Sequence, residues 1–228
     1  MEENLCKNCY LNNNCNLDKS ICDGNFCVKK YKIDYLYSES LITDKQKQHI
    51  DLRIDSDNSD KEQFTQLKEI ENNILEFIKD GKNLYIYSKN CGNGKTSWSL
   101  RMVESYFNKI WNGAKLECKV LFINVPKFLI TLKENISEFS EYINFIKKNI
   151  LKANVVIWDD IGTKAITTYE SEYLLNYIDN RINLGKSNIY TSNLNNSELH
   201  QFLGDRLYSR IVNLSKCIEL KGADKRGI

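Results

Sequence analysis

The amino-acid sequence predicts an α/β protein in which helices flank a parallel β-sheet. From residue 59 onward, short apolar segments alternate with longer segments of helical periodicity, and this alternation is typical of parallel sheets. Polar residues follow the apolar segments, as at Asp159 and Asn193. Because ligands of such sheets bind beyond the carboxyl ends of the strands, we expect the functional residues just after each strand.

Each element of this region has a local signal in the sequence. A capping box at Ser59 and Glu62 predicts the start of a helix with an apolar face, and Gly81 predicts its end. Apolar segments predict strands at residues 83–88, 118–125, 155–158, 188–192 and 216–220. Helical periodicity predicts helices from the loop after the first strand to about residue 111, and at residues 127–135, 138–151, 170–185, 197–203 and 205–213.

Composition and charge limit the classes of function. The chain has 228 residues, of which 42% are hydrophobic and 27% charged, as in globular proteins. A net charge of +2 neither predicts nor excludes a nucleic-acid partner. The sequence contains no apolar run of the ~18–20 residues that cross a bilayer, and its first residues lack the apolar core of a signal peptide. We therefore expect a soluble, cytoplasmic protein without a membrane partner.

The sequence changes character near residue 58. Residues 1–58 contain five of the eight cysteines and end in a polar, aspartate-rich stretch that is typical of a linker. Residues 59–228 contain the alternating strands and helices. We predict a small cysteine-rich module with its linker in residues 1–58 and a nucleotide-binding domain in residues 59–228.

The strongest motif lies at residues 89–96, with the sequence KNCGNGKT. It resembles the phosphate-binding P-loop G-x-x-x-x-G-K-[ST], with Lys89 in place of the first glycine. Gly92 and Gly94 would let the backbone approach phosphates, Lys95 would contact the β- and γ-phosphates, and Thr96 would ligate Mg²⁺. The predicted nucleotide-binding residues are Asn90, Cys91, Gly92, Asn93, Gly94, Lys95, Thr96, Ser97 and Asp159.

Two further strands end in candidate catalytic residues. The apolar residues 155–158 precede Asp159 and Asp160, which is the form of a Walker B element. Asp159 would hold Mg²⁺ together with Thr96, and Asp160 would orient the attacking water. Asn193 follows the next predicted strand and would contact the γ-phosphate or the lytic water, although an Asx turn is an equally good interpretation.

Two arginines, Arg206 and Arg210, lie four positions apart on one face of a predicted helix. An arginine in this place can reach the γ-phosphate of a neighbouring subunit as an arginine finger, and we assign that role to Arg210. A surface salt bridge is the alternative for Arg210 and the preferred interpretation for Arg206.

The amino-terminal cysteines have the spacing C-x2-C-x5-C-x6-C-x4-C. Four thiolates bind zinc tetrahedrally, and C-x2-C pairs position two of them well. We predict a zinc site formed by Cys6, Cys9, Cys22 and Cys27, in which Cys15 can replace one ligand. An iron–sulfur cluster and free surface thiols are the alternatives.

Together these residues resemble the AAA+ ATPases, and among them the DnaC/DnaI-type replicative helicase loaders and the IstB-like ATPases. The resemblance covers residues 60–228 and rests on the segments NLYIYSKNCGNGKTS, VVIWDDIG, IYTSNLN, DRLYSRI and GADKR. In that family the nucleotide lies between subunits, and DnaI-type loaders carry an amino-terminal zinc module that contacts the helicase. Arg226 matches a terminal basic residue of the family, and the sequence leaves little or no room for a carboxy-terminal lid.

The resemblance implies an ATP-dependent loader of a replicative hexameric helicase onto single-stranded DNA. ATP, Mg²⁺ and Zn²⁺ would be its cofactors, it would act as a homo-oligomer, and its small size suggests a phage or mobile-element type. The alternatives are an IstB-like regulator of transposition, a P-loop small-molecule kinase and a non-enzymatic zinc adaptor. The cysteine-rich module argues against the regulator and the lack of an arginine-rich lid against the kinase. The intact Lys95, Thr96, Asp159 and Asp160 argue against the adaptor.

Overall fold

A single five-stranded parallel sheet organises the part of the chain that the structure describes. The computed structural model describes residues 9, 11, 15, 27–47, 52, 59–134, 139–163 and 166–225. The strands are β1 (Asn83–Tyr87), β2 (Val120–Asn124), β3 (Val155–Asp159), β4 (Ser187–Ser192) and β5 (Ser215–Glu219). Their order in the sheet is β2-β3-β4-β1-β5, and all the pairs are parallel. The predicted fold class of a parallel sheet flanked by helices is therefore confirmed.

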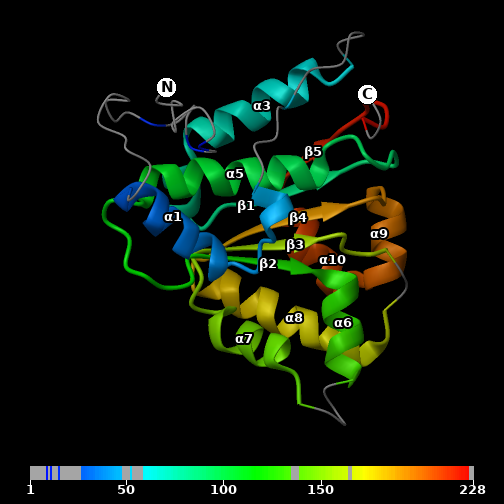
Figure 1. Cartoon of the computed structure of the whole chain (residues 1–228). Helices are drawn as coiled ribbons and strands as arrows, with labels where there is room; N and C mark the ends of the chain where they lie inside the picture. Colours follow the sequence, from blue (N-terminus) through cyan, green and yellow to red (C-terminus); the bar gives the residue numbers. More distant parts are fainter. Residues whose placement is uncertain are drawn as a thin grey trace.

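Helices form a layer on each face of this sheet (Figure 1). One layer contains α1 (Val28–Ser38), α3 (Lys61–Asn72), α4 (Ile74–Lys79) and α5 (Lys95–Ile110). The other contains α6 (Val125–Glu134), α7 (Glu141–Asn149) and α8 (Thr168–Asn183). After β4 the chain forms α9 (Asn196–Leu203), α10 (Asp205–Tyr208) and a π-helical turn at Ser209–Asn213, while the short α2 (Asp44–Lys47) follows α1.

Both faces of the sheet are buried, because successive side chains of a strand point in opposite directions. In β3, Val155 and Ile157 join the core beneath α5, whereas Val156 and Trp158 join the core beneath α6 and α8. Strands buried on both faces read as continuous apolar runs rather than alternating ones, which explains why these segments were recognisable in the sequence.

The helix that follows residue 59, α3, differs from the prediction. The capping box expected at Ser59 and Glu62 is wrong, because α3 begins at Lys61 with Asp60 in the N-cap position and no side chain caps it. The predicted helix is also interrupted: α3 ends at Asn72, and α4 runs from Ile74 to Lys79. The Asp60 side chain is buried and bonds elsewhere, as described below.

Residues before 59 contribute to the same core. α1, which was not predicted from the sequence, packs against α5 with the rings of Tyr37 and Phe107 edge to face at 5.0 Å. Leu11, Ile33 and Leu36 belong to the same buried cluster. The proposed division of the chain at residue 58 stays a prediction. No helix in the described part of the chain has the length and apolar character that a membrane span needs.

A buried polar network joins the amino ends of the central strands. Arg181 of α8 is fully buried and donates to Asn188 Oδ1 at 2.8 Å and to Ser187 O at 2.6 Å. The Asn188 side-chain amide donates in turn to Asn83 Oδ1 at 3.0 Å, which links β4 to β1. These bonds fix the strands at the end of the sheet opposite the candidate site.

Candidate functional site

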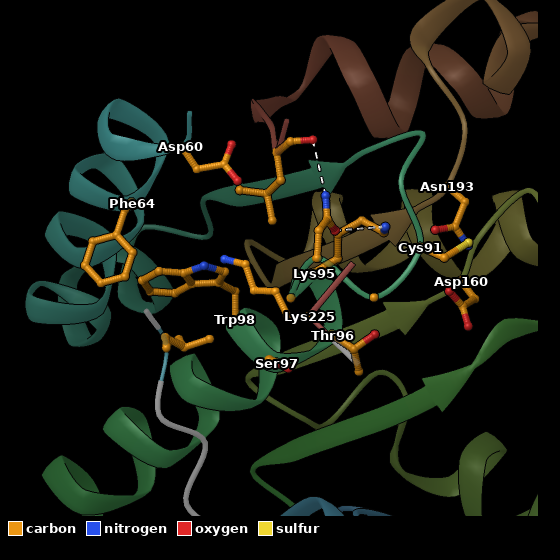
Figure 2. A pocket seen from close by; sticks show the side chains of 15 residues that line it. Asp60, Phe64, Cys91, Lys95, Thr96, Ser97, Trp98, Asp160, Asn193 and Lys225 are labelled. Carbon is orange, nitrogen blue, oxygen red and sulfur yellow. Dashed lines mark hydrogen bonds between the residues drawn. The ribbon is translucent and has the colours of Figure 1, made fainter. Parts of the chain in front are cut away.

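A cleft of about 480 Å³ lies beyond the carboxyl ends of the strands (Figure 2). Its volume is in the range of small-molecule sites. It is lined by Leu52, Asp60, Phe64, Cys91, Gly92, Asn93, Gly94, Lys95, Thr96, Ser97, Trp98, Asp160, Asn193, Leu220 and Lys225. The structure thus brings most of the predicted nucleotide-binding residues together with Asp160 and Asn193. Asn90 and Asp159 adjoin this cleft through hydrogen bonds.

The loop between β1 and α5 has the backbone shape that the motif predicts. Gly92 and Gly94 have φ angles of +71° and +102°, in the left-handed region that favours glycine. Lys95 is the first residue of α5, a helix of 16 residues. The first amides of such a helix have no partner within it, and its dipole favours negative charge at this end. The loop and the helix end therefore form an anion-binding concavity.

Lys95 crosses this concavity. Its buried ammonium group donates to Asn90 O at 2.8 Å and to Asn93 Oδ1 at 3.3 Å. Both of these acceptors are neutral amide oxygens. A phosphate oxygen is a stronger acceptor for an ammonium group than an amide oxygen, because the hydrogen bond is then charge-assisted on both sides.

Thr96 and Asp159 meet at the end of β3. The Thr96 hydroxyl donates to Asp159 Oδ1 at 2.8 Å, and the Thr191 hydroxyl of β4 donates to the same oxygen at 2.8 Å. Burial raises the pKa of Asp159, and the nearby charge of Asp160 raises it further. A buried carboxylate next to a hydroxyl supplies the oxygen ligands that Mg²⁺ prefers, so this pair fits a divalent cation.

Asp160 and Asn193 lie at the same end of the cleft (Figure 2). Asp160 is half-buried and has a φ angle of +58°, which is uncommon for a residue other than glycine. Its backbone N–H donates to the Thr191 hydroxyl at 3.0 Å. Asn193 directly follows β4, as expected from the strand boundary.

An apolar region forms the opposite end of the cleft. The rings of Phe64 and Trp98 lie edge to face at 5.1 Å, and Leu52 and Leu220 line the same cleft. Figure 2 shows this aromatic pair at one end, the carboxylate of Asp160 at the other, and Lys95 between them. Trp98 is a packed residue of α5, and its side chain is only 4% exposed. Phe64 and Leu52 therefore provide most of the apolar surface that this end of the cleft offers to a flat ring.

The residues after β5 lie along the loop, and we call residues 220–225 the carboxy-terminal segment. Asn90 Nδ2 donates to Gly222 O at 3.0 Å, and Asn93 Nδ2 donates to Leu220 O at 3.3 Å. The backbone N–H of Lys225 donates to Gly92 O at 3.0 Å. The loop is therefore held by hydrogen bonds to a strand end far away in the sequence.

Two further contacts involve the loop between β1 and α5: that of Gly92 with Asp224, and that of Lys89 with Glu198. A Cβ atom on Gly92 would lie 1.7 Å from Asp224 Oδ1, so a larger residue there would have to displace the Asp224 side chain and would also be strained by the φ angle of +71°. Lys89, which replaces the first glycine of the motif, is exposed and lies 3.7 Å from Glu198 of α9.

The two candidate arginines do not line the cleft of their own chain. Arg210 Nε lies 2.6 Å from Asp179 Oδ1 on α8, and both side chains are partly exposed. Arg206 is exposed on α10. The surface salt bridge considered for Arg210 is thus present in the single chain, and the role of a finger acting on another subunit remains a prediction.

The predicted zinc ligands are only partly described. Cys6 and Cys22 lie outside the described residues, as does Arg226. Cys9, Cys15 and Cys27 are free and half-buried, and Cys27 caps α1 by accepting a hydrogen bond from Lys30 N at 3.5 Å. Among the residues that the structure describes, no three cysteine, histidine or acidic side chains form a metal-binding cluster. The zinc site therefore stays a prediction.

Sequence reasoning did not assign Asp60, Phe64, Leu220 or Thr191 to the site. Asp60 and Phe64 have the pattern of an ordinary helix start and helix face. Leu220 ends an apolar segment like any other. Only the threonine carried a usable signal, because a hydroxyl in a strand buried on both faces needs a hydrogen-bond partner.

Comparison with known proteins agrees with this geometry. The sequence profile of the family described as IstB-like ATP binding protein matches residues 35–226. No curated protein sequence matches the chain. The structure of the DnaC helicase loader is similar, with a TM-score of 0.59 and 20% sequence identity, over 82% of this chain and 98% of that chain. The structure of DnaI has a TM-score of 0.56 and 21% identity, over 75% of this chain and 87% of that chain.

A replication initiator has the same fold. DnaA bound to AMPPCP and single-stranded DNA has a TM-score of 0.61 and 16% identity, over 80% of this chain and 52% of that chain. At these identities the structural matches establish the fold alone, which is the P-loop AAA+ fold that the sequence predicted. The family profile covers the phosphate-binding loop, both carboxylates and the carboxy-terminal segment. The chain therefore belongs to the family of IstB-like ATP-binding proteins.

Proposed function

We propose that this protein hydrolyses ATP in the cleft and uses the ATP cycle to load a replicative helicase onto single-stranded DNA. The observation that carries the first part is the 2.8 Å hydrogen bond between Thr96 and Asp159. It joins the phosphate-binding loop to the acidic end of β3, next to the buried ammonium group of Lys95. This is the arrangement that phosphoryl transfer to water needs.

In the proposed reaction, one end of the cleft binds the base, the loop binds the phosphates, and the other end holds Mg²⁺ and the attacking water. Phe64, together with Leu52 and Leu220, would contact the base, and the amides after Gly92 together with Lys95 would bind the phosphates. Thr96 and Asp159 would hold Mg²⁺, which neutralises charge on the phosphates when bound. Asp160 and Asn193, which line the same cleft, would orient the attacking water and stabilise the γ-phosphate.

The helicase-loading role is supported by family membership and by the fold shared with DnaC and DnaI. In this proposal the chain assembles as a homo-oligomer on single-stranded DNA. Residues 1–58 contact the replicative hexameric helicase, with zinc bound by Cys6, Cys9, Cys22 and Cys27, or by Cys15 in place of one of them. A set of thiolates within a short segment fits zinc chemically.

A second candidate function is regulation of a transposase. The family profile that matches the chain carries the IstB name, so it favours this function as directly as it favours loading. The two functions differ in the partner that the amino-terminal cysteines would engage. Affinity capture of purified replicative helicase, with a transposase in parallel, separates them: retention of the transposase alone would exclude the loader.

Replacing one of two lysines of the loop by alanine tests the nucleotide site. Lys95→Ala removes the buried ammonium group, whereas Lys89→Ala removes an exposed one in the same loop and is the matched control. We expect titration with a fluorescent ATP analogue to show at least a tenfold weaker affinity for Lys95→Ala and an unchanged affinity for Lys89→Ala. Equal affinity of wild type and Lys95→Ala would show that the site is assigned wrongly.

The zinc site has its own test. Elemental analysis of protein purified without added metal should find one zinc per chain, and Cys6→Ser should lower that content. A zinc content near zero under reducing conditions, or an iron–sulfur absorption band, would exclude the site without affecting the nucleotide-binding proposal.

A further inference from the structure

We infer that Thr191 is a positioning residue that holds both carboxylates of the active site in their working geometry. This inference rests on the proposed ATP hydrolysis, and it names a residue of β4 that does not itself line the cleft. Its hydroxyl touches both Asp159 and the backbone of Asp160.

The hydroxyl of Thr191 makes two different hydrogen bonds at once. It donates its single proton to Asp159 Oδ1 at 2.8 Å and accepts the backbone N–H of Asp160 at 3.0 Å. A hydroxyl has one proton to donate and two lone pairs, so the two bonds are compatible. One side chain of β4 therefore fixes the orientation of the first carboxylate and the backbone that carries the second.

The backbone of β4 strengthens the same contact. Ile161 N donates to Thr191 O at 2.9 Å, and the Ser192 hydroxyl donates to Ile161 O at 2.7 Å. Between these bonds, Asp160 has its φ angle of +58°. Since a left-handed conformation is unfavourable for aspartate, it persists only where surrounding bonds impose it. The bonds from Thr191 are in a position to impose it.

Thr191 lies in a buried part of the sheet, where a hydroxyl is unfavourable unless it forms hydrogen bonds. The residue is fully buried in the central part of the sheet, opposite Ile86 of β1. Valine has nearly the same shape and would fill this place without the cost of burying a polar group. The hydroxyl is tolerated because the carboxylate and the amide of the neighbouring turn satisfy it.

This geometry predicts a selective effect on catalysis. The hydroxyl of Thr191 bonds to Asp159 and to the backbone of Asp160, and the residue does not line the cleft where the phosphates and the base would bind. Its removal should therefore misplace the groups that act on the transferred phosphoryl group and leave nucleotide affinity nearly unchanged. Loss of an interaction that orients a ligating or catalytic side chain typically costs about 10–100-fold in activity.

The test compares Thr191→Val, which removes only the hydroxyl, with Thr191→Ser, which keeps it. Thr131→Val on α6 is the control, because its hydroxyl bonds to the main chain at Lys127 O and lies outside the cleft. We expect Thr191→Val to lower kcat about 10–100-fold with ATP affinity within about twofold of wild type, and Thr191→Ser to restore most of kcat. Thr131→Val should behave like wild type.

Amide hydrogen exchange provides a readout that does not depend on turnover. The amides of Asp160 and Ile161 should exchange faster in Thr191→Val than in wild type, while the rest of β3 stays protected. Equal kcat in wild type and Thr191→Val, or unchanged exchange at Asp160, would overturn the inference. So would a parallel loss of ATP affinity and stability that serine does not restore. A wild-type protein that binds but never hydrolyses ATP would instead refute the proposed function, and exchange at Asp160 would still decide the role of Thr191.

Discussion

The carboxylate of Asp60 accepts a hydrogen bond from the backbone N–H of Gly222 at 2.8 Å, although the two residues are 162 positions apart. Its other oxygen accepts the N–H of Lys221 at 2.6 Å. Asp60 is buried at the start of α3, and the residues it binds belong to the carboxy-terminal segment that lies along the phosphate-binding loop. The start of α3 and the carboxy-terminal segment therefore meet at the nucleotide cleft.

Replacing Asp60 should lower both the stability of the protein and its affinity for ATP. Asn in this place loses the charge and puts an NH₂ group against a backbone N–H, so one hydrogen bond is lost and the other is weakened. Hydrogen bonds to charged groups contribute about 1.5–3 kcal/mol each, so we expect a lower free energy of unfolding and weaker ATP affinity for Asp60→Asn. Asp80→Asn, at an exposed pair with Lys82, is the matched control. Urea titration and ATP titration measure the two effects, and identical behaviour of both variants would contradict the prediction.

Arg210→Ala should abolish ATP turnover and leave ATP binding intact. Arg210 does not line the cleft of its own chain, so a direct contact with the γ-phosphate would have to be made in the cleft of another subunit. An arginine finger supplied by a neighbour contributes about 10³–10⁵ in rate. Arg206→Ala, on α10 just before the π-helical turn that contains Arg210, is the control and should retain activity.

Mixing variants tests whether Arg210 acts between subunits. Mixtures of Arg210→Ala with Lys95→Ala should regain part of the activity, because one chain brings an intact loop and the other an intact arginine. Asp179→Asn, which frees Arg210 from its 2.6 Å ion pair, should not lower turnover. Without recovery at any mixing ratio, and with a wild-type specific activity independent of concentration, Arg210 would be only a surface ion-pair residue.

Arg181→Met should destabilise the fold without changing the cleft. Burial lowers the pKa of Arg181, because its charge lies away from water, where its hydrogen-bond acceptors are neutral oxygens of Ile150, Ala153, Ser187 and Asn188. Methionine fills the space but leaves these acceptors unsatisfied, so the free energy of unfolding should fall by about 3–5 kcal/mol. Urea unfolding measures it, with Arg206→Met as the exposed control, and ATP affinity of the folded variant should match wild type. A loss no larger than that of the control would contradict the assigned role.

Stability should decrease above about pH 9–10. Burial raises the pKa of the Cys118 thiol to about 12 and that of Tyr142 to about 12, and it raises the pKa of Tyr85 and Tyr190 as well. In the unfolded chain these groups lose protons near their ordinary pKa values, while in the folded protein they keep them. The folded state then binds more protons, so its stability is complete below the ordinary pKa and falls as pH rises. Urea midpoints measured from pH 7 to 11 should decline over this interval, and a constant midpoint would contradict the prediction.

The parts of the fold that the sequence predicted depend on local signals. Each strand is a continuous apolar run, and Gly92, Gly94, Lys95 and Thr96 lie together in the chain. These patterns arise from contacts between near neighbours, so no knowledge of the tertiary structure was needed. The ends of the strands were predicted to within a few residues for the same reason.

The parts that could not be predicted depend on distant segments. Asp60 occupies a helix N-cap position, but its carboxylate accepts hydrogen bonds from the backbone amides of Lys221 and Gly222 instead of capping α3. α1 has no clear amphipathic face in its sequence, and it is stabilised by tertiary packing, as where Tyr37 contacts Phe107 of α5. Thr191 is one hydroxyl in an apolar strand, and only its neighbour across the sheet shows what it binds.

The position of β1 in the sheet determines the order in which the protein can fold. Its two neighbours, β4 and β5, are synthesised long after it, so β1 has no strand to pair with until most of the chain is present. Closing such long loops is slow, and the phosphate-binding loop receives the contacts of the carboxy-terminal segment only when β5 has joined the sheet. ATP that binds this completed loop would shift the folding equilibrium by mass action. Nucleotide binding is thus a measure of complete folding, and a nascent or partly unfolded chain would escape capture by immobilised ATP.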